Sequence, residues 1–237
     1  FASTKVKAES KYVFNASTAY KTETWQIGMA IQQEMQSKVK MRTFVQTGQP
    51  LPVSNDIEIE NMQYYDPWVI RFNFAKNFAL ATVYLGADYQ MWKNYQTPLV
   101  NLKKIDGVML SSGGYEKVET RPVLIPRIGL SIHATERFDW NLGAFYRPTP
   151  FKGTFSGPGN SVDTDVTSLT SGLDYTFKSK QADWKLSAAM EFQHLSEINV
   201  TKSSNMENGN SGLKIGSPGY KVGGNIFAYA LSLTFFL

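Results

Sequence analysis

The sequence contains no cysteine, only two histidines and no long apolar run. The missing cysteines exclude a disulfide framework and any metal site built from thiolates. No stretch approaches the roughly 20 apolar residues that a transmembrane helix needs. The two histidines, His133 and His194, lie outside any HExxH or Ser/His/Asp-type setting. We therefore expect no enzyme activity, no metal and no cofactor.

Charge is also sparse and evenly spread. The chain of 237 residues has 24 Lys and Arg against 20 Asp and Glu, which gives a formal net charge of +4. The basic residues never form the dense run that is typical of a nucleic-acid-binding arm. We therefore expect no nucleic-acid partner and place these charges in solvated loops and on polar faces.

Aromatic residues, by contrast, are abundant. They make up 14% of the chain, although the mean hydropathy is only −0.28. Residues 225–237 combine both properties, because apolar and small or polar residues alternate there with a period of two. An outer-membrane barrel uses such strands, since one face meets lipid and the other meets a polar lumen. The apolar face carries Phe227, Tyr229, Leu231, Leu233, Phe235 and Leu237.

The same alternation recurs along the chain and predicts about ten strands. The clearest segments lie at residues 12–20, 25–31, 68–75, 81–92, 127–134, 138–147, 169–177 and 184–192, with an early strand near 2–8. Short turns are expected at 21–23, 76–77, 135–137 and 178–181, and long links near 47–66, 93–120, 148–164 and 199–221. The two kinds of connection largely alternate, as in bacterial barrels with short periplasmic turns and long extracellular loops.

These patterns predict a single all-β domain over residues 1–237: a transmembrane antiparallel β-barrel in the bacterial outer membrane, surrounded by outer-membrane lipid and lipopolysaccharide. The alternative is a soluble β-sandwich or lipocalin-like barrel, in which the aromatic rows would form a core. The membrane barrel is favoured because so many apolar rows need an apolar exterior.

The polar phase of the predicted strands supplies candidate ligand-binding residues. Aromatic rings can hold an apolar chain, and an arginine can meet a carboxylate. Barrel interiors also hold arginines that only neutralise acids, and Asp88, Asp139 and Glu191 share this phase. The candidates that would line the lumen are Arg71, Asn73, Tyr84, Trp92, Arg127, His133, Phe145 and Arg147.

Several segments form an ordered set: residues 12–20 (YVFNASTAY), 25–31 (WQIGMAI), 66–68 (DPW), 87–92 (ADYQMW), 126–129 (PRIG), 140–146 (WNLGAFY) and 168–177 (SLTSGLDYTF). In this order they resemble the FadL family of outer-membrane transporters for long-chain fatty acids and other hydrophobic compounds. The resemblance implies passive diffusion of a hydrophobic small molecule through a barrel. That family's barrel has fourteen strands and an N-terminal hatch in its lumen. About ten strands correspond to its back portion, which the rest of the barrel or a second polypeptide would complete.

Two other functions fit the same strands. A general diffusion porin would conduct small hydrophilic solutes and would show no saturable fatty-acid binding. A structural or interaction barrel would engage a protein partner and would bind no ligand.

Overall fold

The computed structural model describes residues 2–8, 11–46, 54–95, 101–104, 119–153, 163–178, 183–201 and 219–236. This part of the chain is built almost entirely from antiparallel β-strands, which confirms the predicted all-β architecture. The one helix in this part of the chain is the short 3-10 turn η1 (Trp92–Asn94), which is too short to span a bilayer.

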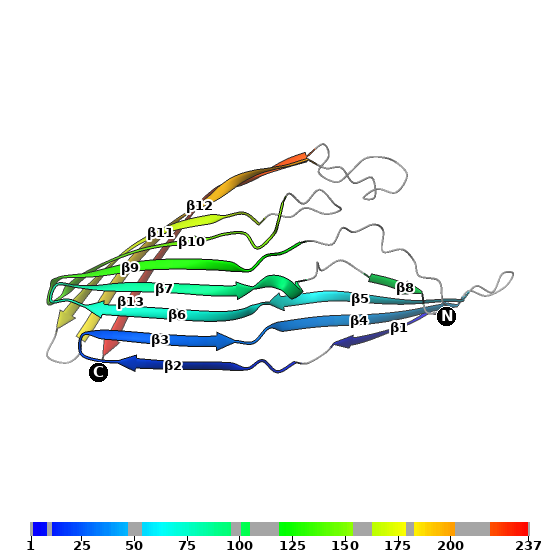
Figure 1. Ribbon diagram of the computed structural model, residues 1–237, viewed down its shortest axis with the longest axis horizontal. Helices are drawn as coiled ribbons and strands as arrows, with labels where there is room; N and C mark the ends of the chain where they lie inside the picture. Colours follow the sequence, from blue (N-terminus) through cyan, green and yellow to red (C-terminus); the bar gives the residue numbers. More distant parts are fainter. Residues whose placement is uncertain are drawn as a thin grey trace.

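Nine strands form the larger sheet in the order β13-β12-β11-β10-β9-β7-β6-β3-β2. With the four strands of a smaller sheet, the described residues form thirteen strands, more than the ten or so that the sequence predicts. Every strand pairs antiparallel with its neighbours. Figure 1 shows β2 to β9 in front and β10 to β13 crossing obliquely behind them, so the sheet is strongly curled. The bounds are β2 Asn15–Lys21, β3 Trp25–Gln32, β6 Trp68–Asn77, β7 Ala81–Met91, β9 Val123–Thr135, β10 Phe138–Arg147, β11 Val166–Lys178, β12 Asp183–Thr201 and β13 Gly219–Phe236.

A smaller sheet extends the larger one at one end. Its order is β1-β4-β5-β8, with bounds β1 Ala2–Ala8, β4 Met35–Gln46, β5 Ser54–Asp66 and β8 Asn101–Lys104. Only Pro67 separates β5 from β6, and a proline interrupts a ladder because it has no N–H to donate. The long link expected near residues 47–66 is therefore shorter than predicted. The apolar Ile57 and Ile59 alternate with acidic residues in β5, which is a strand pattern despite the charge.

Connections of different length separate the two ends of the larger sheet. Turns at residues 22–24, 78–80 and 136–137 join successive strands at the short-turn end, on the left of Figure 1. The opposite, long-loop end carries the smaller sheet and the longer links. One turn lies two residues later than predicted, because Asn77 stays in β6. Its backbone N–H donates to the carbonyl of Thr24 at 2.8 Å.

The two faces of the larger sheet differ in chemistry. The buried apolar side chains among the described residues are few: Val69, Val123, Ile125, Val166 and Val200. Large apolar side chains are exposed instead in rows on the other face. Leu231, for example, is 76% exposed and Phe227 is 63% exposed. Such rows are unstable in water and require an apolar exterior. We call this apolar face the outer face and the opposite, polar one the inner face.

Candidate functional site

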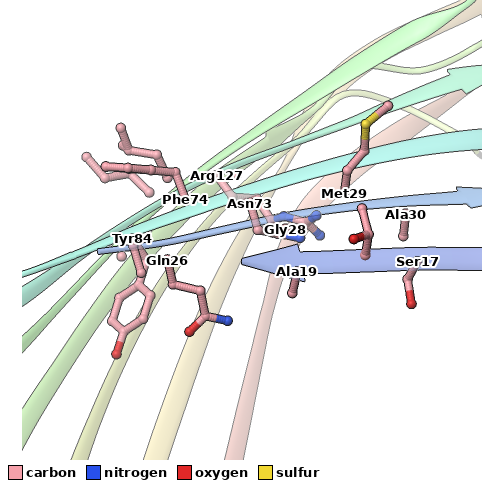
Figure 2. A pocket seen from close by; sticks show the side chains of 16 residues that line it. Ser17, Ala19, Gln26, Gly28, Met29, Ala30, Asn73, Phe74, Tyr84 and Arg127 are labelled. Carbon is pink, nitrogen blue, oxygen red and sulfur yellow. The ribbon is translucent and has the colours of Figure 1, made fainter. Parts of the chain in front are cut away.

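The inner face of β2, β3, β6, β7 and β9 lines a hollow of about 600 Å³. Figure 2 shows Tyr84 and Gln26 projecting to one side of these strands, while Met29 and Phe74 project to the other. Glycines keep the hollow open. A Cβ built on Gly28 would have the carbonyl oxygen of Thr18, 3.8 Å away, as its nearest neighbour. Small residues on adjacent strands thus leave space that a ligand can fill.

Strand register places seven of the eight predicted lumen residues on this inner face: Arg71, Asn73, Tyr84, Arg127, His133, Phe145 and Arg147. The eighth, Trp92, begins η1 directly after β7. The side chains do not converge on one point. Asn73, Tyr84 and Arg127 line the hollow, whereas Trp92, His133 and Arg147 belong to separate groups. The role of all eight residues in ligand binding stays a prediction.

The first group is a carboxylate shared by two arginines. Asp88 bonds to Arg127, and its second oxygen lies 3.7 Å from Nε of Arg71. The Asp88 side chain is only 8% exposed, whereas the arginines are 38% and 40% exposed. The predicted pairing of Asp88 with arginine is thus confirmed. Gln32 adds a contact, since its Oε1 accepts from Arg71 at 3.0 Å.

The cluster has a net charge of +1, because two guanidinium groups share one carboxylate. Arg127 also lies beside the hollow that it helps to line, close to Gly86, whose added Cβ would be 3.5 Å from its Nε. A guanidinium presents five N–H donors in a fixed fork and can bind a second carboxylate while it holds the first. The arrangement can therefore receive an anionic headgroup at the wall of the hollow.

The second group is an aromatic cluster toward the long-loop end. The rings of Tyr65, Trp92 and Tyr95 lie 5.5 to 5.8 Å apart between centroids, and Phe151 lies 5.4 Å from Tyr95. The Tyr65 hydroxyl donates to Glu34 at 3.2 Å. Burial raises the pKa of Tyr95, and the negative charge of Asp163 adds to this effect. The cluster is a tightly packed apolar surface with a hydrogen-bonded rim.

The third group surrounds His133 near the short-turn end. Its Nδ1 lies 2.7 Å from Oδ1 of Asp139, and its Nε2 lies 3.3 Å from Oγ1 of Thr82. Asp139 lies on the inner face as predicted, but it pairs with a histidine instead of an arginine. Glu191 does not pair with arginine either, since it accepts from Ser168 at 2.6 Å and from Gln193 at 2.9 Å. Its cross-strand neighbours, Thr170 of β11 and Ala228 of β13, are uncharged.

Arg147 serves a loop rather than the hollow. Its Nη2 donates to Oδ1 of Asp163 at 2.9 Å, and the Thr149 hydroxyl donates to the other oxygen of Asp163 at 2.7 Å. These bonds fix residues 148–153, which we call the strap, at the end of β10. Arg147 is thus a structural arginine, the alternative that the sequence left open for each lumen arginine.

Sequence reasoning missed Gln32, Glu34 and Tyr65, which complete the arginine and aromatic groups. Gln32 continues the inner phase of β3, so strand alternation could have identified it. Tyr65 could not be found that way, because the alternation predicts a long link at residues 47–66, whereas the structure places Tyr65 in β5. Among the described residues, no group of three His, Asp or Glu side chains is arranged to hold a metal ion.

The curled antiparallel sheet, with one apolar and one polar face, is that of an outer-membrane-type β-barrel. Among solved structures, the structure of this chain is similar to the crystal structure of a Pseudomonas aeruginosa FadL homologue, with a TM-score of 0.62 and 16% identity. That match covers 93% of this chain but only 51% of the homologue, so the chain spans about half the homologue's length. The CymD monoaromatic hydrocarbon channel is a more distant match, with a TM-score of 0.45 and 14% identity over 76% of this chain and 46% of that one. No protein-family model and no curated protein matches the sequence. The chain therefore has the FadL fold, as the resemblance of its segments predicts.

Proposed function

We propose that this chain forms part of an outer-membrane barrel through which hydrophobic small molecules, such as long-chain fatty acids, pass by diffusion. The observation that carries the proposal is the hollow on the inner face, bordered by Tyr84 and Arg127, in a sheet whose outer face exposes apolar rows. The shared fold with a FadL homologue supports the same function. No chemical step is required of the chain, and we propose that it is not an enzyme.

The ligand class follows from two groups, the aromatic cluster and the arginine cluster. The aromatic cluster of Tyr65, Trp92 and Tyr95 can shelter an apolar chain near the long-loop end. Arg71 and Arg127, on the inner face, supply the positive charge for a carboxylate. An amphipathic acid satisfies both, whereas a small hydrophilic solute gains nothing from the aromatic rings. Further strands, from the rest of the protein or a second polypeptide, would close the wall around this path.

The test is to fill the hollow. Gly28→Leu places an isobutyl group where the nearest atom to the Cβ is 3.8 Å away, so the strand is expected to fold unchanged. We expect saturable uptake of a labelled long-chain fatty acid to fall about tenfold, because the side chain occupies the ligand's space. Gly28→Ala is the matched control and should keep most of the uptake. Both variants are compared at equal amounts in the outer membrane.

The rival functions give different results. A general diffusion porin would show conductance for small hydrophilic solutes in planar bilayers and no saturable fatty-acid binding in the native protein. An interaction barrel would show neither uptake nor conductance. Unchanged fatty-acid uptake in Gly28→Leu would contradict the proposed path through this hollow.

A further inference from the structure

The hollow on the inner face contains two rows of residues that run across β3, β6, β7 and β9. The strand register aligns the first row, which consists of Gly28, Asn73, Gly86 and Arg127. The second row lies two residues nearer the short-turn end and consists of Gln26, Ala75, Tyr84 and Gly129. All of these residues line the hollow. Small and polar residues alternate in both rows, so every polar residue has a small neighbour on its own strand and on each adjacent strand of its row.

The small residues give the polar side chains room to lie over the sheet. A Cβ built on Gly86 would be 3.0 Å from Oδ1 of Asn73 and 3.5 Å from Nε of Arg127. One built on Gly129 would be 3.5 Å from Cδ2 of Tyr84. Asn73 and Arg127 therefore both lean over Gly86, and the Tyr84 ring lies against Gly129. The first row thus brings an amide and a guanidinium together at one place.

Three polar side chains of the hollow, Gln26, Asn73 and Tyr84, are available to a ligand. All three are exposed, and none has a hydrogen-bond partner within the part of the chain that the structure describes. Figure 2 shows Gln26 and Tyr84 extending to the same side of the strands. The amides and the phenol can each donate and accept, whereas Arg127 can only donate. The hollow therefore offers neutral hydrogen-bonding groups in addition to a cation.

The rows on either side of these two are paired within the protein. Toward the long-loop end, Arg71 stands directly opposite Asp88, and its Nε lies 3.7 Å from Oδ2 of that acid. Toward the short-turn end, Thr82 stands opposite Asn77, and its hydroxyl donates to Oδ1 of the amide at 3.2 Å. Residues directly opposite each other on adjacent strands are close enough to interact. In the first and second rows, each polar residue instead faces a glycine or an alanine, so the pattern of residues keeps their polar groups unpaired.

An unsubstituted acyl chain does not match the second row. The carboxylate of a fatty acid has two oxygens, which Arg127 and Asn73 of the first row can satisfy. The rest of the chain is apolar, so it displaces water from Gln26 and Tyr84 without replacing the lost hydrogen bonds. That loss lowers the affinity, and a hydroxyl group on the chain would prevent it.

We propose that the hollow selects long-chain acids that carry a hydroxyl group near the carboxylate. This inference rests on the proposed function and specifies its ligand class. Arg127 and Asn73 of the first row bind the carboxylate, and Gln26 and Tyr84 of the second row bind the hydroxyl. Alternate residues of a strand lie about 7 Å apart, so the hydroxyl belongs within the first few carbon atoms after the carboxylate.

The test compares two isomers that bind to the native protein in detergent micelles. The hydroxyl of 3-hydroxyhexadecanoic acid lies near the carboxylate, and that of 16-hydroxyhexadecanoic acid lies at the far end of the chain. Titration calorimetry should show about tenfold tighter binding of the first isomer, which is the effect of one additional hydrogen bond. Equal affinities, with hexadecanoic acid also bound, would overturn this proposal and leave the proposed function in place. Binding of none of the three acids would contradict both.

Matched variants test the role of the second row. Gln26→Met and Tyr84→Phe remove the polar groups and keep the approximate size of the side chains. The double variant should lose the preference for the 3-hydroxy isomer. It should bind hexadecanoic acid at least as tightly as the native protein does, because the acyl chain then displaces no hydrogen-bonding group. An unchanged preference in the double variant would overturn the proposal.

The control is Tyr89→Phe, which removes a hydroxyl from the outer face of the same strand, β7. This variant should keep the native preference, since Tyr89 lies outside the hollow. Loss of the preference in the control as well would contradict the assignment to Gln26 and Tyr84. The comparison in the native protein decides the proposal even if the double variant does not fold.

Discussion

At the scale of single residues, identical side chains on one face have different roles. Arg127 and Arg147 both lie on the inner face, yet Arg127 borders the hollow while Arg147 is bonded to Asp163 of a loop. The difference depends on which acid each guanidinium can reach. Asp88 is shared by two arginines and leaves one positive charge available, whereas Asp163 is engaged by Arg147 and Thr149. Binding function is therefore expected at Arg127.

The prediction for this residue concerns ligand charge. Arg127→Gln should weaken binding of a long-chain fatty acid about tenfold, because a charge-assisted hydrogen bond is lost at a partly exposed site. Binding of its methyl ester, which has no carboxylate, should change little. Titration calorimetry of both ligands in micelles measures the difference. Arg137→Gln, in the exposed turn after β9, is the matched control. An equal loss for acid and ester would contradict the role assigned to Arg127.

At the scale of elements, the strap after β10 is held by acids that precede β11. Asp165 accepts from the Thr149 N–H and from the Tyr146 hydroxyl, both at 2.7 Å. Phe151 at the other end of the strap contacts Tyr95 of the aromatic cluster. The acids that precede β11 thus hold the strap, and its position depends on their charge.

The strap is expected to loosen in acid. Burial alone would raise the pKa of Asp165, but hydrogen bonds from Thr149 and Tyr146 and two nearby arginines outweigh it and lower that pKa. A lowered pKa means that the bonds stabilise the strap above the carboxyl's ordinary pKa, about 4, and that this stability is lost as the pH falls below it. Hydrogen exchange at residues 148–153 should rise accordingly. Asp165→Asn should show the faster exchange already at neutral pH. Slow exchange in that variant would mean that other contacts hold the strap.

A second element-scale prediction concerns the irregularity between β12 and β13. The register shifts between Leu195 and Ile198, opposite Gly223 and Gly224, whose φ angles are +154° and +142°. A Cβ at Gly223 would be 2.8 Å from Cα of Glu197, whereas one at Gly224 would meet no atom within 4 Å. Gly223→Ala should therefore lower the free energy of unfolding by about 1–3 kcal/mol, more than Gly224→Ala does. Urea unfolding in micelles compares the two variants. The folded and unfolded fractions are separated by their different mobilities on a gel of unheated samples. Equal effects would mean that the backbone angle alone, and not the contact, is responsible.

At the scale of the whole molecule, the sheet separates two ends as well as two faces. Short turns lie at one end, and the strap and the smaller sheet lie at the other (Figure 1). In an outer-membrane barrel the short turns face the periplasm and the longer loops face the exterior. The fold thus predicts an orientation that can be tested directly.

The test uses the absence of cysteine from this chain. Glu136→Cys lies in the turn after β9, and Lys152→Cys lies in the strap, and both positions are exposed. A membrane-impermeant maleimide added to intact cells should label Lys152→Cys and leave Glu136→Cys unlabelled. Both should react after the outer membrane is permeabilised. Labelling of Glu136→Cys in intact cells would reverse the orientation or place the protein elsewhere.

The sequence by itself determined the strands of the larger sheet and their faces, but not β4, β5 and β8 of the smaller sheet. A period of two is a local property, since each residue's neighbours in the chain decide which side it faces. Residues 225–237 and the alternation around Arg71 and Arg127 therefore predicted the outer and inner faces correctly. The resemblance of ordered segments led to the same FadL fold that the structural match shows.

Only the tertiary structure decided which inner residues meet. Asp88 lies between two arginines because β6, β7 and β9 are neighbours in that order. His133 reaches both Thr82 and Asp139 for the same reason, although all three residues look unrelated in the sequence. Register sets these contacts through hydrogen bonds between strands that lie far apart along the chain. Local alternation contains no information on that register, so a face could be predicted and a site could not.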